Sequence, residues 1–142
     1  MVFSSQAQPL QRLTNQNRSN YMIQRLPGKA PGRSAGSAFG SFVFIATVAD
    51  DRKADLVLQS SDLLSRLEGQ LSALGSDKSS ILSATVYLAD MSRKSEFDKI
   101  WIEWIGEDQR DWPQRACVGA VLAEQTAVEI SVIAVRRDET TA

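Results

Sequence analysis

The chain has 142 residues, the length of one ordinary domain and enough to bury a hydrophobic core. At 43% hydrophobic and 23% charged it is globular in composition, and no apolar run approaches the roughly 20 residues that a transmembrane helix needs. The absence of histidine excludes Ser-His-Asp and Cys-His nucleophiles, histidine bases and nearly all zinc sites. The single cysteine, Cys117, excludes an intrachain disulfide and suits a reducing compartment, so we expect a cytoplasmic protein.

The net charge of −1 is unevenly distributed along the chain. Residues 1–49 carry five basic residues and no acidic residue, whereas the remainder carries eleven basic and seventeen acidic residues, so the two parts have charges of +5 and −6. Residues 1–20 are polar and lack hydrophobic periodicity, which predicts a flexible extension before a single domain at 21–137 and a flexible tail at 138–142. The basic N-terminus leaves import into an organelle open, as well as a weak nucleic-acid arm.

The first part of the domain is typical of short strands around a loop. Residues 21–26 alternate as a strand does, and residues 27–37 contain three glycines and two prolines, which predicts a loop. Residues 39–48 predict a β-hairpin with a tight turn at Gly40-Ser41. The polar side chains of the preceding loop, Arg33, Ser34 and Ser37, are interpreted first as a solvated surface and second as a substrate contact.

Leucines at three-and-four spacing predict an amphipathic helix over residues 54–74, which Gly75 terminates. Gln59, within this helix, is interpreted as a surface residue. Residues 81–88 predict a strand, with Leu82 on the face of the other even-numbered apolar residues and Ile81 on the opposite face.

A second helix is predicted by an apolar stripe from Phe97 to Ile105, with Ser92 or Ser95 as its N-cap. Its two tryptophans, Trp101 and Trp104, lie on this stripe, so we interpret them as core residues between helix and sheet and not as a stacking platform for nucleic acid.

Residues 113–135 predict two strands joined by a polar loop, which we interpret as a hairpin. Arg115 and Glu129 are the charges within it. A turn at 123–126 offsets them by about five residues, on the order of 16 Å along the ladder, so we expect a site that uses both to draw them from different subunits. Cys117 shares a strand face with Arg115 and is interpreted as a small buried hydrophobe, not as a nucleophile.

The order of elements predicts an α+β fold, with two helices packed on one face of a single mixed sheet. Phosphate-binding and dinucleotide-binding glycine motifs, cysteine clusters and the H-E-x-x-H motif do not occur, so we expect no metal and no cofactor.

The pattern P-x-R-A-C-V-x-A-x-L followed by V-E-I-x-V-x-A-V resembles the end of the Rid (YjgF) family of small trimeric enamine/imine deaminases. The resemblance continues upstream through residues 75–90 and 97–104 and covers roughly 40–135. It implies a chorismate-mutase-like fold and a homotrimer with active sites between neighbouring subunits. It also implies hydrolysis of small 2-imino acids to 2-oxo acids and ammonia.

The resemblance assigns roles to particular residues. Arg115 matches the arginine that holds the substrate carboxylate, and Glu129 matches the glutamate associated with the attacking water. Cys117, Ser34 and Ala46 are the further candidates for contact with the substrate.

The chain also departs from the family pattern. Relatives usually carry a glycine where Ala46 falls and an aromatic residue in the loop before it. These departures leave open a non-catalytic trimer that binds small carboxylates. Ribonuclease activity is disfavoured by the acidic body of the chain, so no nucleic-acid partner is expected, and no membrane partner either.

Overall fold

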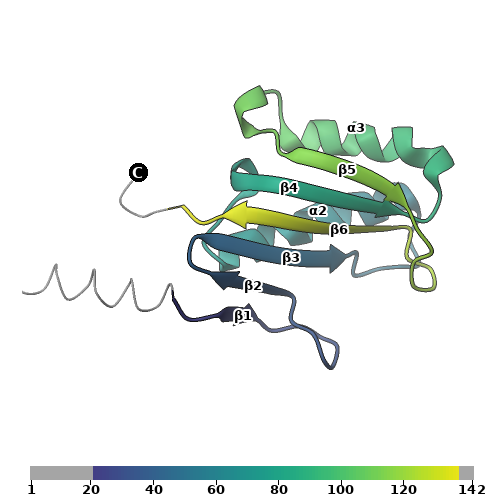
Figure 1. Cartoon of the computed structure of the whole chain (residues 1–142). Coiled ribbons are helices and arrows are strands. Elements are labelled where there is room, and N and C mark those ends of the chain that lie inside the picture. The colour runs from purple at the N-terminus through teal and green to yellow at the C-terminus, as the bar shows by residue number, and fades with distance from the viewer. Residues whose placement is uncertain (1–20, 138–142) are drawn as a thin grey trace, which may run out of the picture.

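Within the described part of the chain, six strands form one mixed sheet and two helices cover one of its faces (Figure 1). The computed structural model describes residues 21–137, so the extension predicted at 1–20 and the tail predicted at 138–142 lie outside the described residues. The strands are β1 (Gln24–Leu26), β2 (Gly36–Phe39), β3 (Phe42–Val48), β4 (Ile81–Leu88), β5 (Gln114–Gly119) and β6 (Val128–Val135). The helices are α2 (Leu56–Ala73) and α3 (Lys94–Ile105), and short 3-10 turns occur at η1 (Lys78–Ser80), η2 (Met91–Arg93) and η3 (Gln109–Asp111). The predicted α+β class is confirmed.

The β2–β3 hairpin turns at Gly40-Ser41, as its sequence predicts. Gly40 adopts a φ of +59°, which favours glycine, and Phe39 pairs with Phe42 directly across the turn. Strand β2 begins at Gly36, inside the segment that its composition assigned to a loop. Here glycine allows a close approach, because a Cβ atom at Gly36 would lie 3.0 Å from Leu74 Cδ1 and 3.1 Å from Ile45 Cγ1.

Helix α2 buries its leucine stripe against the sheet. Leu63, Leu67 and Leu71 are completely buried, which confirms the predicted amphipathic face. The helix ends with two backbone hydrogen bonds, from Ser76 N–H to the Leu71 carbonyl at 2.8 Å and from Gly75 N–H to the Ser72 carbonyl at 3.1 Å. Gly75 has a φ of +81°, so it is the left-handed glycine of a Schellman ending, as expected.

Helix α3 packs its aromatic residues into the core, with Phe97 completely buried and Trp101 7% exposed. The interpretation of Trp101 as a core residue therefore agrees with its burial. The predicted serine cap is wrong, because the side chain of Asp90 caps η2 by accepting from Ser92 N–H, and α3 follows η2 without a side-chain cap. The chain enters α3 through the 3-10 turn η2, and the capping side chain lies before η2. The sequence prediction assumed instead a single N-cap directly before the helix.

The core lies between the helices and the alternate residues of β3, β4 and β6 that face them. At the start of β4 a register irregularity lies between Ile81 and Ser83. Because of it, Ile81 joins the core at 4% exposure and Leu82 is 49% exposed, the reverse of the sequence expectation.

The hairpin predicted for residues 113–135 is wrong. Strand β4 lies between β5 and β6, pairing in parallel with β5 and antiparallel with β6 (Figure 1). The connection from β4 to β5 contains α3, and such a helical crossover is what parallel neighbours require. Alternation along β5 and β6 indicated the two strands correctly but carries no information about which strands are neighbours.

Candidate functional site

Arg115 and Glu129 lie on opposite faces of the sheet. Arg115 is level with Ala84 of β4, a core residue that is 1% exposed, so its side chain is on the helix side. Glu129 is level with Tyr87, on the other side, which we call the open face. The backbone positions of Arg115 and Glu129 are two strands apart across the sheet, about 10 Å, and three residues apart along the strands, also about 10 Å. The expectation that they form no cross-strand pair is correct, although the register on which it was based is wrong.

Arg115 is held at the edge of the sheet by α3. Its Nη2 donates to Asp98 Oδ1 at 2.6 Å, and its guanidinium carbon lies 5.7 Å from the ring centroid of Phe97 and 5.3 Å from that of Trp101. The side chain is 19% exposed. Its Nε and Nη1 make no hydrogen bond within residues 21–137, so the guanidinium retains N–H donors for an anion.

Asp98 joins two cations, because Lys94 Nζ also donates to it, to Oδ2 at 2.6 Å. Burial, the largest influence on the pKa of Asp98, favours the neutral acid. Hydrogen bonds from Lys94 and Arg115, together with the charges of these residues, outweigh burial and lower the pKa below 3.8. Asp98 is therefore ionised at neutral pH and orients the guanidinium of Arg115.

The lowered pKa of Asp98 predicts a pH-dependent contribution to stability. A carboxyl whose pKa is lower in the folded state stabilises the fold above its unfolded pKa and loses this contribution as pH falls through the folded pKa. We expect Asp98→Asn to lower the free energy of unfolding in urea at pH 7 and the difference from wild type to shrink below about pH 4. Glu103→Gln, on the same helix and without a salt bridge within the described residues, is the control. A difference that is constant from pH 7 to pH 3 would contradict the assignment.

Cys117 lies two residues after Arg115 on the same face of β5, as predicted, and it is only partly buried. Burial raises the pKa of its thiol, and the positive charges of Arg115 and Lys94 only partly oppose this. The residue is therefore a neutral thiol at physiological pH, which is a poor nucleophile.

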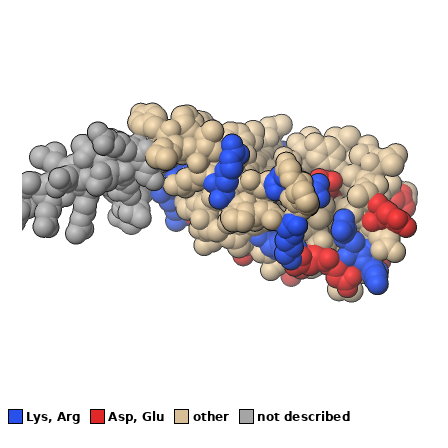
Figure 2. All heavy atoms as spheres, turned by 90° about the horizontal axis from the view of Figure 1, so that it is seen from below, with Lys and Arg blue, Asp and Glu red and all other residues tan. Residues whose placement is uncertain are grey.

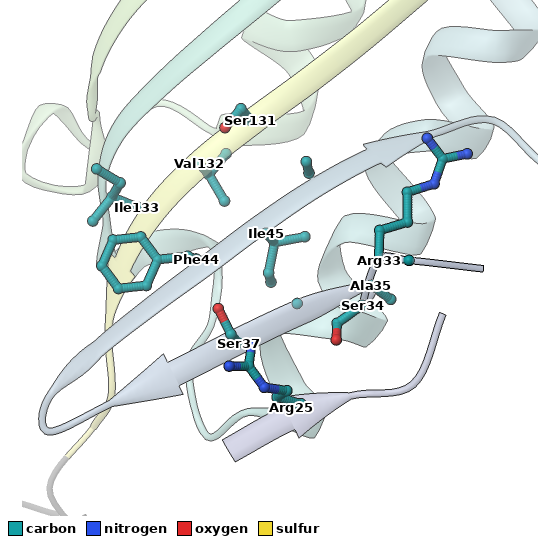
Figure 3. Close-up of a pocket in the computed structure, with 13 residues that line it drawn as sticks. Arg25, Arg33, Ser34, Ala35, Ser37, Phe44, Ile45, Ser131, Val132 and Ile133 are labelled. Carbon is teal, nitrogen blue, oxygen red and sulfur yellow. The ribbon is translucent and has the colours of Figure 1, made fainter. Parts of the chain in front are cut away.

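A second feature is a hollow of about 720 Å³ on the open face, between the 32–37 segment, β3 and β6 (Figure 3). It contains Ser34 and Ala46, so the structure brings together these two candidates, while Arg115 and Cys117 lie on the other face. Glu129 is two residues from Ser131 on the same face as the hollow. The polar residues that line it are Arg25, Arg33, Ser34, Ser37 and Ser131.

Gln59 is a residue whose role the sequence did not reveal. It is 1% exposed, not a surface residue as interpreted, and its Nε2 donates to the carbonyls of Arg52, Ala54 and Gln125 at 2.8–3.2 Å. Its Oε1 accepts from Ala127 N–H at 3.0 Å. The side chain thus connects the segment before α2 to the segment before β6. Its position on the helix, one turn before the leucine at 63, was the available signal for burial.

Among residues 21–137, no three carboxylate or cysteine side chains are grouped as ligands for a metal ion. No helix in the same range is both long and apolar enough to cross a lipid bilayer.

The single mixed sheet backed by two helices defines an α+β protein of the YjgF type. The chain belongs to the family described as endoribonuclease L-PSP, which includes the YjgF, RutC and Rid proteins, because the family model matches residues 35–136. A RutC family protein of Haemophilus ducreyi is 36% identical over 96 residues, covering 67% of this chain and 80% of the relative. YoaB of Escherichia coli, also a RutC family protein, is 32% identical over 93 residues, covering 65% and 80%.

Solved structures agree with this assignment. The crystal structure of NMB1025, a YjgF family member from Neisseria meningitidis, has a TM-score of 0.75 and 31% identity, covering 84% of this chain and 98% of the other. YyfA of Yersinia pestis, of the Rid family, has a TM-score of 0.73 at 19% identity, over 80% and 99% of the two chains, and supports the fold alone.

Proposed function

We propose that the protein hydrolyses small reactive 2-imino acids to 2-oxo acids and ammonia. The observation that carries this proposal is the guanidinium of Arg115, which is oriented by Asp98 and two aromatic rings and keeps Nε and Nη1 unused. Nη2 carries a second N–H besides the one that Asp98 accepts, and together with Nε or Nη1 it provides two parallel donors that match the two oxygens of a carboxylate. The guanidinium thereby fixes the substrate by the group that all 2-imino acids share.

In the proposed reaction, the oxygen of a water molecule bonds to the imine carbon and the carbon–nitrogen bond breaks. The protonated imine and water together give the ketone and an ammonium ion. Glu129 orients the water and accepts its proton before passing it to the departing nitrogen. An iminium carbon is already electrophilic, so positioning and one carboxylate are sufficient chemical assistance.

The proposed active site is shared between subunits of a homotrimer. Arg115 and Glu129 of one chain lie on opposite faces of the sheet. One substrate can therefore contact an arginine and a glutamate of these positions only if the two residues come from different subunits. Apolar side chains on the open face support such an assembly, since Phe39, Phe42 and Phe44 are 44–48% exposed and lie close to the exposed Ile133. In the trimer, the open-face hollow with Ser34 and Ala46 receives Arg115 and Cys117 of a neighbour.

A non-catalytic carboxylate-binding protein of the same fold is the second candidate. It is favoured by the hollow itself, because the loop beside it offers Arg33, Ser34 and Ser37 but no aromatic residue, and Ala46 contributes a methyl group. Such a protein keeps the carboxylate contact of Arg115 but lacks the arrangement that guides water to the imine.

Ribonuclease activity is supported less well. Figure 2 shows the side of the molecule near β1, where basic side chains are scattered and acidic ones gather towards one end. Some of the basic residues are neutralised, as in the salt bridges that Lys29 and Arg66 form with Asp50. Binding to a polynucleotide backbone requires a run of unpaired cations.

A coupled assay tests the proposed function. Amino-acid oxidase generates imines from a panel of amino acids, semicarbazide traps them, and hydrolysis by the protein lowers the rate of trapping. We expect a lower rate for at least one small imine. If no imine is hydrolysed while 2-oxo acids bind saturably in calorimetry, the binding protein is the correct function, and the absence of both results rejects the two candidates.

A further inference from the structure

We propose that the open-face hollow makes the protein selective for dianionic substrates, namely 2-imino acids with a second carboxylate on the side chain. This inference rests on the proposed function, because Arg115 of a neighbouring subunit is taken to hold the carboxylate next to the imine. The hollow then binds the second carboxylate through Arg25 and Arg33.

The charge of the hollow is the first argument. Arg25 and Arg33 line it, and no acidic residue does. Neither arginine forms a salt bridge within the described residues, whereas the nearby Lys29 is paired with Asp50. Guanidinium groups stay charged at every physiological pH, so the hollow holds two positive charges that the described chain does not neutralise.

The arrangement of the donors is the second argument. Arg25 lies beside its cross-strand neighbour Ser37, whereas Arg33 extends along β3 towards the end of that strand (Figure 3). The two guanidinium groups therefore flank the hollow from different sides, with Ser34 and Ser131 also at its wall. The guanidinium and hydroxyl groups at the wall of the hollow offer N–H and O–H donors to a carboxylate, which accepts several hydrogen bonds.

The surroundings of the hollow strengthen this interaction in the assembled protein. Phe44 and Ile133 form an apolar wall and are exposed in the single chain. When another copy covers the open face, water is displaced and the attraction between guanidinium and carboxylate increases as the effective dielectric constant falls. Two unpaired cations at such an interface are costly to bury, and an anionic ligand offsets that cost.

Matched substrates test the proposal in the full-length protein. Glutamate and norvaline give five-carbon imines that differ only in a terminal carboxylate against a methyl group, and oxidases specific for acidic and neutral amino acids produce them. We expect kcat/KM for the dianionic imine to exceed that for the neutral-chain imine by about tenfold or more, a ratio typical of one charge-assisted hydrogen-bond pair.

Variants identify which arginine produces the preference for the dianionic imine. Arg33→Ala and Arg25→Ala should each lower the ratio of the two kcat/KM values, by about tenfold for the residue that makes the main contact, and the double variant should bring it close to one. Lys29→Ala is the control, since Lys29 lies in the same loop, has an 85% exposed side chain and does not line the hollow. It should retain the wild-type ratio.

The possible failures are distinguishable. A wild-type protein that hydrolyses both imines equally well, or arginine variants that leave the ratio unchanged, would overturn the dianion proposal while the deaminase function stands. If neither imine is hydrolysed, the deaminase function is rejected. Calorimetry with 2-oxoglutarate and 2-oxopentanoate then tests whether the hollow prefers a ligand with a second carboxylate. Tighter binding of 2-oxoglutarate that Arg33→Ala abolishes supports it, and equal or absent binding rejects it.

Discussion

Replacing Arg115 by alanine is expected to lower kcat/KM for imine hydrolysis by at least about 100-fold, the effect of losing a bidentate, charge-assisted contact with a carboxylate. The fold should persist, because Lys94 remains to neutralise Asp98 when Arg115 is removed. The substrate loses the group that positions it, so both KM and kcat are expected to change. The semicarbazide assay gives the rates, and circular dichroism with sedimentation analysis checks fold and assembly.

Two further variants make the result specific. Arg115→Lys keeps the charge but has no planar pair of donors, so we expect activity between that of wild type and Arg115→Ala. Arg110→Ala removes an arginine with an 89% exposed side chain, paired with Asp108, and should leave the rate unchanged. If Arg115→Ala retains activity within about twofold of wild type, Arg115 does not hold the substrate and its pairing with Asp98 is purely structural.

Replacing Gln59 by alanine is expected to lower the free energy of unfolding by about 3 kcal/mol, because it leaves several partly buried backbone groups without a partner. The melting temperature should fall by about 10 °C for a domain of this size. Gln59→Glu should also destabilise the fold, since a carboxylate cannot donate to the carbonyls of Ala54 and Gln125. Urea denaturation at neutral pH measures both changes.

Gln70 provides a matched control on the same helix. Its Oε1 is buried without a hydrogen-bond partner among the described residues, so Gln70→Ala removes an unsatisfied acceptor and should be nearly neutral. Equal destabilisation by Gln59→Ala and Gln70→Ala would show that the cost arises from helix α2 generally and not from the connection between the two loops.

Most helices and strands were predictable, because they depend on the spacing of apolar residues and on turn residues that are close together in the sequence. The leucine spacing of α2, the left-handed glycine at its end and the turn at Gly40 each depend on residues close together in the sequence. The misassigned details depend on distant partners. Gln59 is buried because carbonyls from residues up to 66 positions away surround its amide, and the exposure of Leu82 follows from an irregularity in the pairing of β4 with β6.

The candidate site likewise has features that depend on local sequence and features that depend on distant residues. Arg115 and Cys117 were placed correctly on one face of one strand, since alternation within a strand is a local property. Their relation to Glu129 was not predictable, because it depends on β4 lying between the two strands. The grouping of Arg25 and Arg33 around one hollow likewise requires the cross-strand register and the path of the 27–35 segment.

The sequence by itself determined the α+β class, the boundaries of most elements and the residues that the family pattern singles out. The tertiary structure alone decided that Arg115 faces α3 while Glu129 and the arginine-lined hollow occupy the open face. The physical reason is that hydrophobic periodicity specifies which side of a strand is buried, whereas the choice of neighbouring strand is made by long-range packing.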